Sequence, residues 1–372
     1  MIMSFISAAA NSSIVLLISR LIQGIGSAMM VSTSTALLVS EFPQNERGKI
    51  LGYSVSATYL GLASSPLLGG LMTEAFGWRS VFLLNGIITL FIFLGFITKI
   101  KTESSKIKLN DFDFLGSIIL LISITSLMYG LSKIPEILNI LLAIVGIFGL
   151  VIFVYVERKK TNPILNINLF SKNKTFSFAN LTALINYSST FAITFVLSLY
   201  LQNVRGLTPK NAGLILIAQP IMMTIVSFFS GKMSDKKDPR ILASFGMALI
   251  SIGLFLFTFL SSGTSSLYII LCLLLLGFGF GMFTSPNTNS AMSSVGSEFY
   301  AVASATLSTM RSVGMMFSMA IVAMTTYIFI GNQIINYENI DEYMKSVKVI
   351  FVVFALLCVV GVFTSLVGRT KK

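Results

Sequence analysis

The stretch GLASSPLLGG, residues 61–70, lies within a long apolar run and contains residue types that disfavour a plain helix. Gly61, Ser65 and Gly69 are spaced i, i+4 and i+8, so they form one stripe of small residues on a helix. Helices in lipid associate by close packing along such stripes, and Pro66 removes a backbone hydrogen bond and bends its helix. The stretch predicts a bent, closely packed helix, either between two bundles that rock against each other or in an ordinary helix pair.

The composition of the chain is that of a membrane protein. Of its 372 residues, 55% are hydrophobic and 11% are charged, far below the ~25% charged residues of a soluble domain. Apolar runs of about 20 residues, enough to cross a bilayer, recur along the chain without an alternating polar face, which disfavours a large soluble helical protein. The predicted spans centre on residues 14–38, 50–73, 80–98, 114–132, 138–156, 178–201, 211–230, 241–261, 266–288, 301–330 and 347–367.

The net charge of +12 is distributed unevenly between the loops. If the loop at residues 41–49 lies inside, the inside loops hold eighteen Lys and Arg and the outside loops hold six. This asymmetry follows the positive-inside rule, so we expect a multi-pass protein of the cell membrane with a cytoplasmic C-terminus and no nucleic-acid partner. The chain has no His, which removes the motifs that need one. We expect no metal, no cofactor and no enzymatic activity.

A charged segment at residues 157–174 divides the chain. Shifting the sequence by 253 residues aligns glycines and serines of two successive helices, which indicates two homologous bundles, although chance matches among glycine-rich helices are the alternative. The aligned pairs are Gly24 with Gly277, Gly26 with Gly279, Gly61 with Gly314, and Ser65 with Ser318. We expect an incomplete N-terminal bundle at 1–98, an extra helix pair with cytoplasmic linkers at 99–174, and a six-helix bundle at 175–372. The first two to three helices of the fold are then missing.

Two arginines lie inside predicted spans. Arg20 and Gln23 share one helix face within RLIQGIGSAMM (residues 20–30). A charge in mid-membrane costs roughly 2.5–3.5 kcal/mol on insertion scales, so such a residue normally faces a cavity or a partner. The alternative is that Arg20 reaches the outer interface. We expect Arg311 to face the cavity or to donate to free backbone carbonyls.

Several motifs, taken in order, resemble the major facilitator superfamily and within it the fourteen-helix drug–proton antiporters. Arg20 to Gly24 resembles the basic motif of the fourth helix, GWRSVFLLN (77–85) the start of the sixth, and residues 200–220 the entry to the tenth. The antiporter motif is matched by Gly52, Gly61, Ser65, Pro66, Gly69 and Gly70, with Ser65 in place of a glycine. The cytoplasmic loop motif is matched by Gly231, Asp235 and Arg240.

This resemblance implies an all-α polytopic protein with the major-facilitator fold, in which two bundles rock around a central substrate. It implies a secondary active transporter that exports lipophilic or cationic drugs or metabolites by proton antiport, as a monomer in the lipid bilayer. In this family, Arg20 would couple proton movement to substrate movement. The expected partners are therefore a hydrophobic or cationic small molecule, protons and lipid.

The acidic residues favour a second interpretation. All fourteen carboxylates lie in loops or at span ends, whereas a proton antiporter needs an acid inside the membrane. The alternative function is therefore a truncated, non-transporting relic or a transporter-like sensor, which would insert into membranes without moving substrate. A membrane-embedded enzyme is a third interpretation, disfavoured because Ser64 and Ser65 have no base nearby in the sequence.

Overall fold

The computed structural model describes residues 1–99, 113–132, 134, 136–160, 163, 165, 167–331, 333, 335 and 339–367. In order, the helices are α1 (Ile2–Ala8), α2 (Ser13–Glu41), α3 (Arg47–Phe76), α4 (Arg79–Lys99), α5 (Phe114–Ser132), α6 (Ile137–Lys159), α7 (Ile167–Lys172), α8 (Lys174–Thr190), α9 (Ile193–Leu199), the π-helix η2 (Tyr200–Val204), α10 (Pro209–Leu216), α11 (Ala218–Lys236), α12 (Pro239–Phe257), α13 (Ser266–Ser293), the 3-10 helix η3 (Ser297–Phe299), α14 (Tyr300–Ile330) and α15 (Ile340–Leu366).

Local sequence accounts for where several helices begin and end. Thr208 accepts a hydrogen bond from the Asn211 N–H and is followed by a proline at the first helical position, the pattern expected of a helix start. Ser265 caps α13 in the same way. Gly77 follows α3 and Gly331 follows α14, both with positive φ, a conformation that glycine adopts without a steric penalty.

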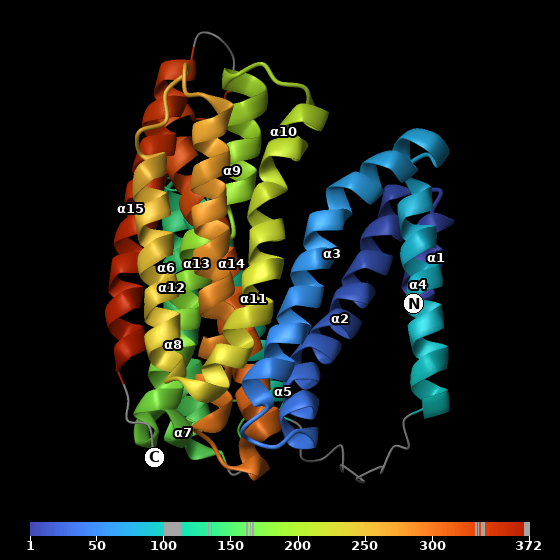
Figure 1. The fold of residues 1–372 in the computed structure, drawn as a ribbon, viewed down its shortest axis with the longest axis vertical. Coiled ribbons are helices and arrows are strands. Elements are labelled where there is room, and N and C mark those ends of the chain that lie inside the picture. The colour runs from blue at the N-terminus through green and yellow to red at the C-terminus, as the bar shows by residue number, and fades with distance from the viewer. Residues whose placement is uncertain are drawn as a thin grey trace.

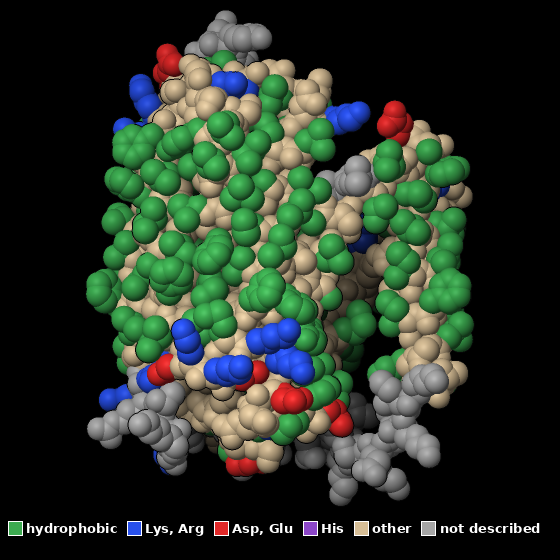
Figure 2. All heavy atoms as spheres, viewed as in Figure 1, with side chains coloured by type: hydrophobic (Ala, Val, Ile, Leu, Met, Phe, Trp, Pro, Cys, Tyr) green, Lys and Arg blue, Asp and Glu red, His purple; other side chains and the backbone are tan. Residues whose placement is uncertain are grey.

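The surface of the described residues fits a lipid environment. Ten segments are helical, long and apolar enough to cross a membrane. Figure 2 shows hydrophobic side chains over the flanks of the molecule and a concentration of Lys and Arg toward its lower end. These observations confirm the prediction of an all-α polytopic membrane protein. A helix covers each of the eleven predicted spans, although α3 is not among the ten segments that meet the length and hydropathy criterion.

The second half of the chain forms a tightly packed group, α8–α15. Gly246 of α12 and Gly279 of α13 lie so close that a Cβ atom on Gly246 would be 2.6 Å from the Gly279 carbonyl oxygen. Phe257 and Phe351 are fully buried between α12 and α15, with ring centroids 5.1 Å apart. Burial of such large apolar side chains stabilises this group.

The first helices form a second group, α1–α4, which diverges from α8–α15 toward the upper end of Figure 1. α1 is held by buried serines: the Ser7 hydroxyl lies 2.7 Å from the Ser19 hydroxyl of α2. On α4, a Cβ atom at Gly86 would lie 2.9 Å from the Phe5 ring, so α1 packs closely on both neighbours. Much of the apolar surface of α2 and α4 is nevertheless exposed.

The helices α5 and α6 form a separate antiparallel pair that also contacts α14. Glycines bring the two backbones together. A Cβ atom on Gly130 would lie 2.4 Å from the Ala143 backbone nitrogen, and one on Gly146 would lie 2.5 Å from the Leu127 nitrogen. Small residues allow this approach in lipid, where van der Waals packing drives association.

We expect Gly146→Ala to destabilise the protein by about 1–3 kcal/mol, because the added methyl group would overlap the α5 backbone. Thermal unfolding in detergent, followed by tryptophan fluorescence, measures this loss. Gly95→Ala is the matched control: Gly95 lies inside α4 with no atom within 4 Å of the added Cβ, and alanine favours a helix over glycine. The packing account is contradicted if both variants shift the unfolding temperature equally.

Candidate functional site

The two helix groups meet where α2 passes α14, with the Ser304 hydroxyl donating to the Ser32 carbonyl, and where α3 passes α11. A Cβ atom on Gly52 would lie 2.8 Å from the Ser227 carbonyl oxygen and 2.9 Å from the Gly231 Cα. One on Gly231 would lie 2.4 Å from the Gly48 carbonyl oxygen. The helices therefore touch backbone to backbone, and only glycine fits at these three positions.

A carboxylate completes this meeting point. Asp235, near the end of α11, accepts hydrogen bonds from the backbone N–H groups of Gly48 (2.7 Å) and Lys49 (2.8 Å) in the first turn of α3. These N–H groups lack partners within their own helix, and the positive end of the helix dipole favours an anion here. We call Gly48, Gly52, Gly231 and Asp235 the lower contact.

Helix α13 supports the lower contact from behind. The Ser285 hydroxyl donates to the Gly48 carbonyl (3.3 Å), and the Asn289 side-chain amide donates to the Ser234 carbonyl (3.3 Å). Further along α3, the Ser56 hydroxyl donates to the Thr224 carbonyl of α11 (2.9 Å). These hydrogen bonds surround the glycine contact, although the buried hydroxyl of Ser227 beside Gly52 has no hydrogen-bond partner in the described chain.

The structure brings together residues that the sequence assigned to separate motifs. Gly52 belongs to the antiporter-like motif, and Gly231 and Asp235 to the cytoplasmic loop-like motif. Gly48 was missed, although it lies four residues before Gly52 and therefore on the same helix face. Arg240 has a different role: its guanidinium pairs with Asp238 (2.7 Å), and this interaction lowers the pKa of Asp238.

The small-residue stripe on α3 does not pack as predicted. Cβ atoms added to Gly61, Gly69 or Gly70 would meet no atom within 4 Å, and Ser65 is exposed. The reason is that α3 leans away from α11 beyond the lower contact (Figure 1), so no helix of the described chain packs on the stripe. The prediction of a contact between bundles along this stripe is wrong for the conformation of this structure. The helix α3 runs without interruption through Pro66.

A buried polar cluster lies about three turns along α3 from Gly48. The Tyr59 hydroxyl of α3 lies 2.8 Å from the Thr284 hydroxyl of α13. Arg311 of α14 donates through Nη2 to the Thr288 hydroxyl, and its guanidinium carbon lies 5.8 Å from the centroid of the Tyr187 ring. We call these five residues the Arg311 cluster. The polar run TSPNTNS (284–290) in the middle of α13 was the signal in the sequence that could have found it.

Arg20 belongs to another cluster. Its Nη1 donates to the Gln23 side-chain oxygen (2.9 Å), and its guanidinium carbon lies 4.2 Å from the centroid of the Phe82 ring of α4. The Gln23 amide in turn donates to the Ser4 hydroxyl of α1 (3.3 Å). Arg20 and Gln23, which the sequence places on one helix face, are hydrogen-bonded to each other, but their partners lie within α1–α4, separate from those of Arg311.

Neither intramembrane arginine has an acidic partner in the described part of the chain. The ion pairs there within 4.0 Å join Lys160 to Asp113 and Arg240 to Asp238, both at the lower end. Arg20 is exposed in this structure, whereas Arg311 is partly exposed and its Nε is buried without a hydrogen-bond partner among these residues. Both guanidinium groups therefore keep donors that are not paired with an acid of the described residues.

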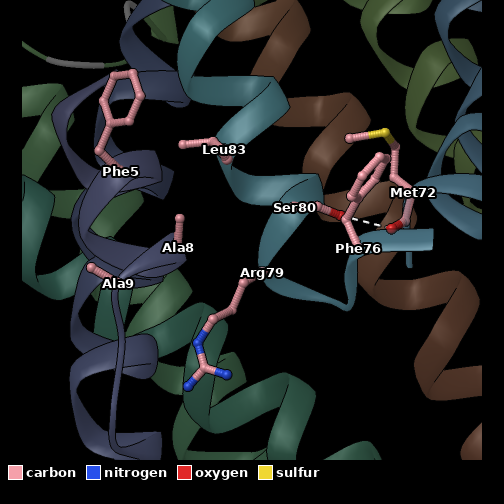
Figure 3. A pocket seen from close by; sticks show the side chains of 8 residues that line it. All are labelled: Phe5, Ala8, Ala9, Met72, Phe76, Arg79, Ser80 and Leu83. Atoms are coloured by element: carbon pink, nitrogen blue, oxygen red, sulfur yellow. Dashed lines mark hydrogen bonds between the residues drawn. The ribbon is translucent and has the colours of Figure 1, made fainter. Parts of the chain in front are cut away.

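A mostly apolar pocket of about 580 Å³ opens between α1, α3 and α4 at the upper end (Figure 3). The Ser80 hydroxyl donates to the Met72 carbonyl (2.9 Å), and the Arg79 guanidinium donates to the Ala10 carbonyl (2.8 Å). The pocket is lined by Phe5, Ala8, Ala9, Met72, Phe76, Arg79, Ser80 and Leu83. Its lining suits an apolar group, and it is separate from the lower contact.

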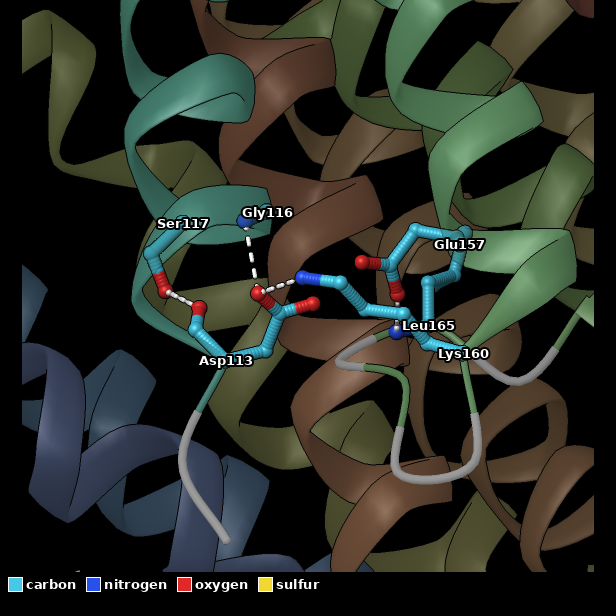
Figure 4. Close-up of polar contacts among 6 residues, drawn as sticks. All are labelled: Asp113, Gly116, Ser117, Glu157, Lys160 and Leu165. Atoms are coloured by element: carbon cyan, nitrogen blue, oxygen red, sulfur yellow. Dashed lines mark hydrogen bonds and ion pairs between the residues drawn. The ribbon is translucent and has the colours of Figure 1, made fainter. Parts of the chain in front are cut away.

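A cluster that the sequence analysis missed holds the lower end of the α5–α6 pair (Figure 4). Asp113 accepts hydrogen bonds from the Lys160 side chain and from the Gly116 N–H (2.7 Å), and buried Glu157 accepts one from the Leu165 N–H (2.9 Å). Burial alone would raise the pKa of Asp113, but these hydrogen bonds keep it below its usual value. The cluster ties the start of α5 to the end of α6.

The profile of the Major Facilitator Superfamily matches residues 1–319. The chain is 28% identical over 317 residues to the riboflavin transporter RibZ of Clostridioides difficile, covering 83% of this chain and 68% of RibZ. It is 28% identical to the multidrug resistance protein Stp of Mycobacterium tuberculosis, covering 82% of this chain and 57% of Stp. It is 30% identical to the methylenomycin A resistance protein of Streptomyces coelicolor, covering 63% of this chain and 50% of that protein.

A solved structure has a similar fold. The crystal structure of the human organic anion transporter MFSD10 matches with a TM-score of 0.65 at 16% identity, covering 97% of this chain and 74% of the other. At this identity the match concerns the fold alone. The chain spans between half and about two thirds of the length of the curated relatives named above.

Neutralising Asp235 should weaken the lower contact, because its carboxylate accepts two hydrogen bonds from α3. Charge-assisted hydrogen bonds are stronger than neutral ones by about 1 kcal/mol, so Asp235→Asn should raise the proportion of molecules with separated lower ends by roughly five-fold. Spin labels on Asn45→Cys and Lys237→Cys, which are exposed and flank the contact, report this separation by pulsed electron resonance. The native Cys272 and Cys358 are buried and should remain unlabelled.

Asp238→Asn is the control for this prediction, since it makes the same chemical change three residues away, where the carboxylate pairs with Arg240 rather than with α3. Its distance distribution should match that of the unsubstituted protein. Equal broadening of the distance distribution in both variants would show that the loop between α11 and α12 holds the lower ends together, rather than the Asp235 carboxylate that caps α3.

Proposed function

Because this chain belongs to the major facilitator superfamily, we propose that it is a secondary active transporter that exports lipophilic drugs or metabolites by alternating access. The observation that carries the proposal is the shape of the molecule: the two helix groups touch in their lower part, through the lower contact, the α2–α14 contact and the Tyr59–Thr284 pair, and they separate toward the upper end. These contacts lie between the groups rather than inside either one, so they can change while each group keeps its own packing.

The proposal includes an orientation. The lower end would face the cytoplasm, together with the C-terminus, because the loops rich in Lys and Arg lie there. The conformation of the structure would then be open to the outside. In this scheme the residues 1–98 and 175–372 act as the two moving bundles, and the α5–α6 pair accompanies α14.

Proton antiport is the coupling mechanism that we propose. Arg20 would bias the protonation of an acid that shares its cavity, because a nearby positive charge favours the ionised form of a carboxyl group. The hydrogen bond to Gln23 and the Phe82 ring hold its guanidinium in place. We also propose that the protein acts as a monomer without a catalytic reaction of its own.

The relatives support export over the alternative of a non-transporting relic. Proteins named for drug resistance align with 63% to 82% of this chain. The family profile covers residues 1–319, which include α2, α3 and α11. On this similarity we propose export rather than the interpretation as a non-transporting relic.

We expect Arg20→Ala to reduce export driven by a pH gradient at least ten-fold while leaving membrane insertion unchanged. Inverted membrane vesicles that contain the protein, loaded with acridine orange as the pH indicator, should lose part of their pH gradient when lipophilic dyes are added. The variant should abolish this response, because the charge that tunes the proton site is lost.

Lys348→Ala removes a charge from the exposed surface of α15 and serves as the control, with an unchanged response expected. The amount of inserted protein is measured in the same membranes by a C-terminal tag. Export by Arg20→Ala at the rate of the unsubstituted protein would refute the coupling role. Absence of any dye-induced response in the unsubstituted protein would refute proton-coupled export itself.

A further inference from the structure

We propose that Arg311 forms a recognition site for the carboxylate or sulfonate group of an amphiphilic organic anion. The inference rests on the proposed transport function and names the charge of its substrate. It departs from the expectation of cationic substrates that the family resemblance suggested.

A guanidinium group has five N–H donors in a planar fork and no acceptor. In this structure Nη2 of Arg311 donates to the Thr288 hydroxyl, whereas Nε is buried and has no hydrogen-bond partner. The side chain as a whole is partly exposed, so part of the fork remains accessible. A carboxylate or sulfonate can accept from two N–H groups of one guanidinium at once.

The surroundings of Arg311 contain hydroxyl groups rather than carboxylates. Thr288 and Thr284 come from α13, and Tyr59 comes from α3 of the other helix group. The phenol of Tyr59 is close enough to Arg311 and Tyr187 to interact electrostatically with both. Since no acid pairs with Arg311 among the residues that the structure describes, the cluster carries a net positive charge.

An aromatic surface lies beside this charge. The Tyr187 ring is 5.8 Å from the guanidinium carbon, and it packs edge-to-face against Phe280 at 6.3 Å. Phe280 is buried and supports the partly exposed Tyr187 ring, which offers an apolar surface for the body of a ligand whose anionic group meets Arg311. A cationic ligand in the same place would be repelled, because charges interact strongly in a site of low dielectric constant.

The position of the cluster connects binding to the change of conformation. Arg311, Tyr187 and Thr284 belong to α8–α15, whereas Tyr59 belongs to α1–α4. A ligand bound to Arg311 would lie beside Tyr59, and therefore at the boundary between the two moving parts, about three turns along α3 from Gly48. A ligand that binds one conformation more tightly than the other shifts their populations, so an anion here would favour the conformation in which both groups reach it.

The test uses two dyes with the same xanthene ring system and opposite charge: fluorescein, a dianion at pH 8, and rhodamine 123, a cation. Binding to the purified protein in lipid nanodiscs is measured by fluorescence anisotropy. We expect fluorescein to bind at least ten-fold more tightly than rhodamine 123. Arg311→Gln should weaken fluorescein binding ten-fold or more, and Arg311→Lys should restore part of it by keeping the charge without the fork.

Arg205→Gln provides the matched control. Arg205 lies at the upper end and donates to the backbone carbonyls of Ser262 and Thr264, so the variant removes the same charge away from the cluster and should leave fluorescein binding unchanged. Tyr187→Leu tests the aromatic wall in case Arg311→Gln lowers stability, and it should weaken both dyes. The proposal is overturned if rhodamine 123 binds as tightly as fluorescein, or if folded Arg311→Gln binds fluorescein normally.

Flux in vesicles separates this inference from the proposed function. Export of rhodamine 123 but not of fluorescein would support the transporter and overturn the anion site. Fluorescein binding that depends on Arg311, without flux of either dye, would support the anion site and overturn export. Absence of both binding and flux would overturn both.

Discussion

The hydrogen bonds from the first turn of α3 to the carboxylate of Asp235 are the interaction on which the arrangement of the two helix groups depends. They satisfy N–H groups that a helix start leaves without partners, and they do so across the boundary between the groups. The glycines at 48, 52 and 231 make this possible, because any larger side chain would keep the two backbones apart. Beside this polar contact, Val39 and Leu51 pack in an apolar cluster with residues of α8, α13 and α14, and the Ser304 hydroxyl donates to α2, so polar and apolar contacts together join the two groups.

Charge inside the membrane is the second constraint. Arg20 and Arg311 are the cations within predicted spans, and each is held by a neutral oxygen and an aromatic ring rather than by an acid of the described chain. Such an arrangement leaves the positive charge available to a proton-binding acid or to a charged substrate. The two arginines lie in different helix groups, so one can serve coupling and the other can serve recognition.

The sequence predicted the helices, their membrane character and the family, because apolar runs, caps and motifs are local properties. It also indicated Gly52, Gly231 and Asp235, but as members of separate motifs. That they form one contact depends on tertiary packing between residues almost 200 positions apart. The stripe from Gly61 to Gly70 illustrates the limit: small residues show that a face can approach a neighbour, but not in which conformation it does so. The Arg311 cluster was only partly foreseen, since its hydroxyl partners come from helices far apart in the sequence.

In this account, one motion of the two helix groups separates them at the lower contact and brings them together at the upper opening. Spin labels on Glu74→Cys, at the upper end of α3, and Lys210→Cys, in α10, measure the upper opening directly. When Asp235→Asn is added, the account predicts that the distances between these labels shorten, because release of the lower ends lets the upper ends approach. Unchanged upper distances, despite separated lower ends, would contradict alternating access in this protein.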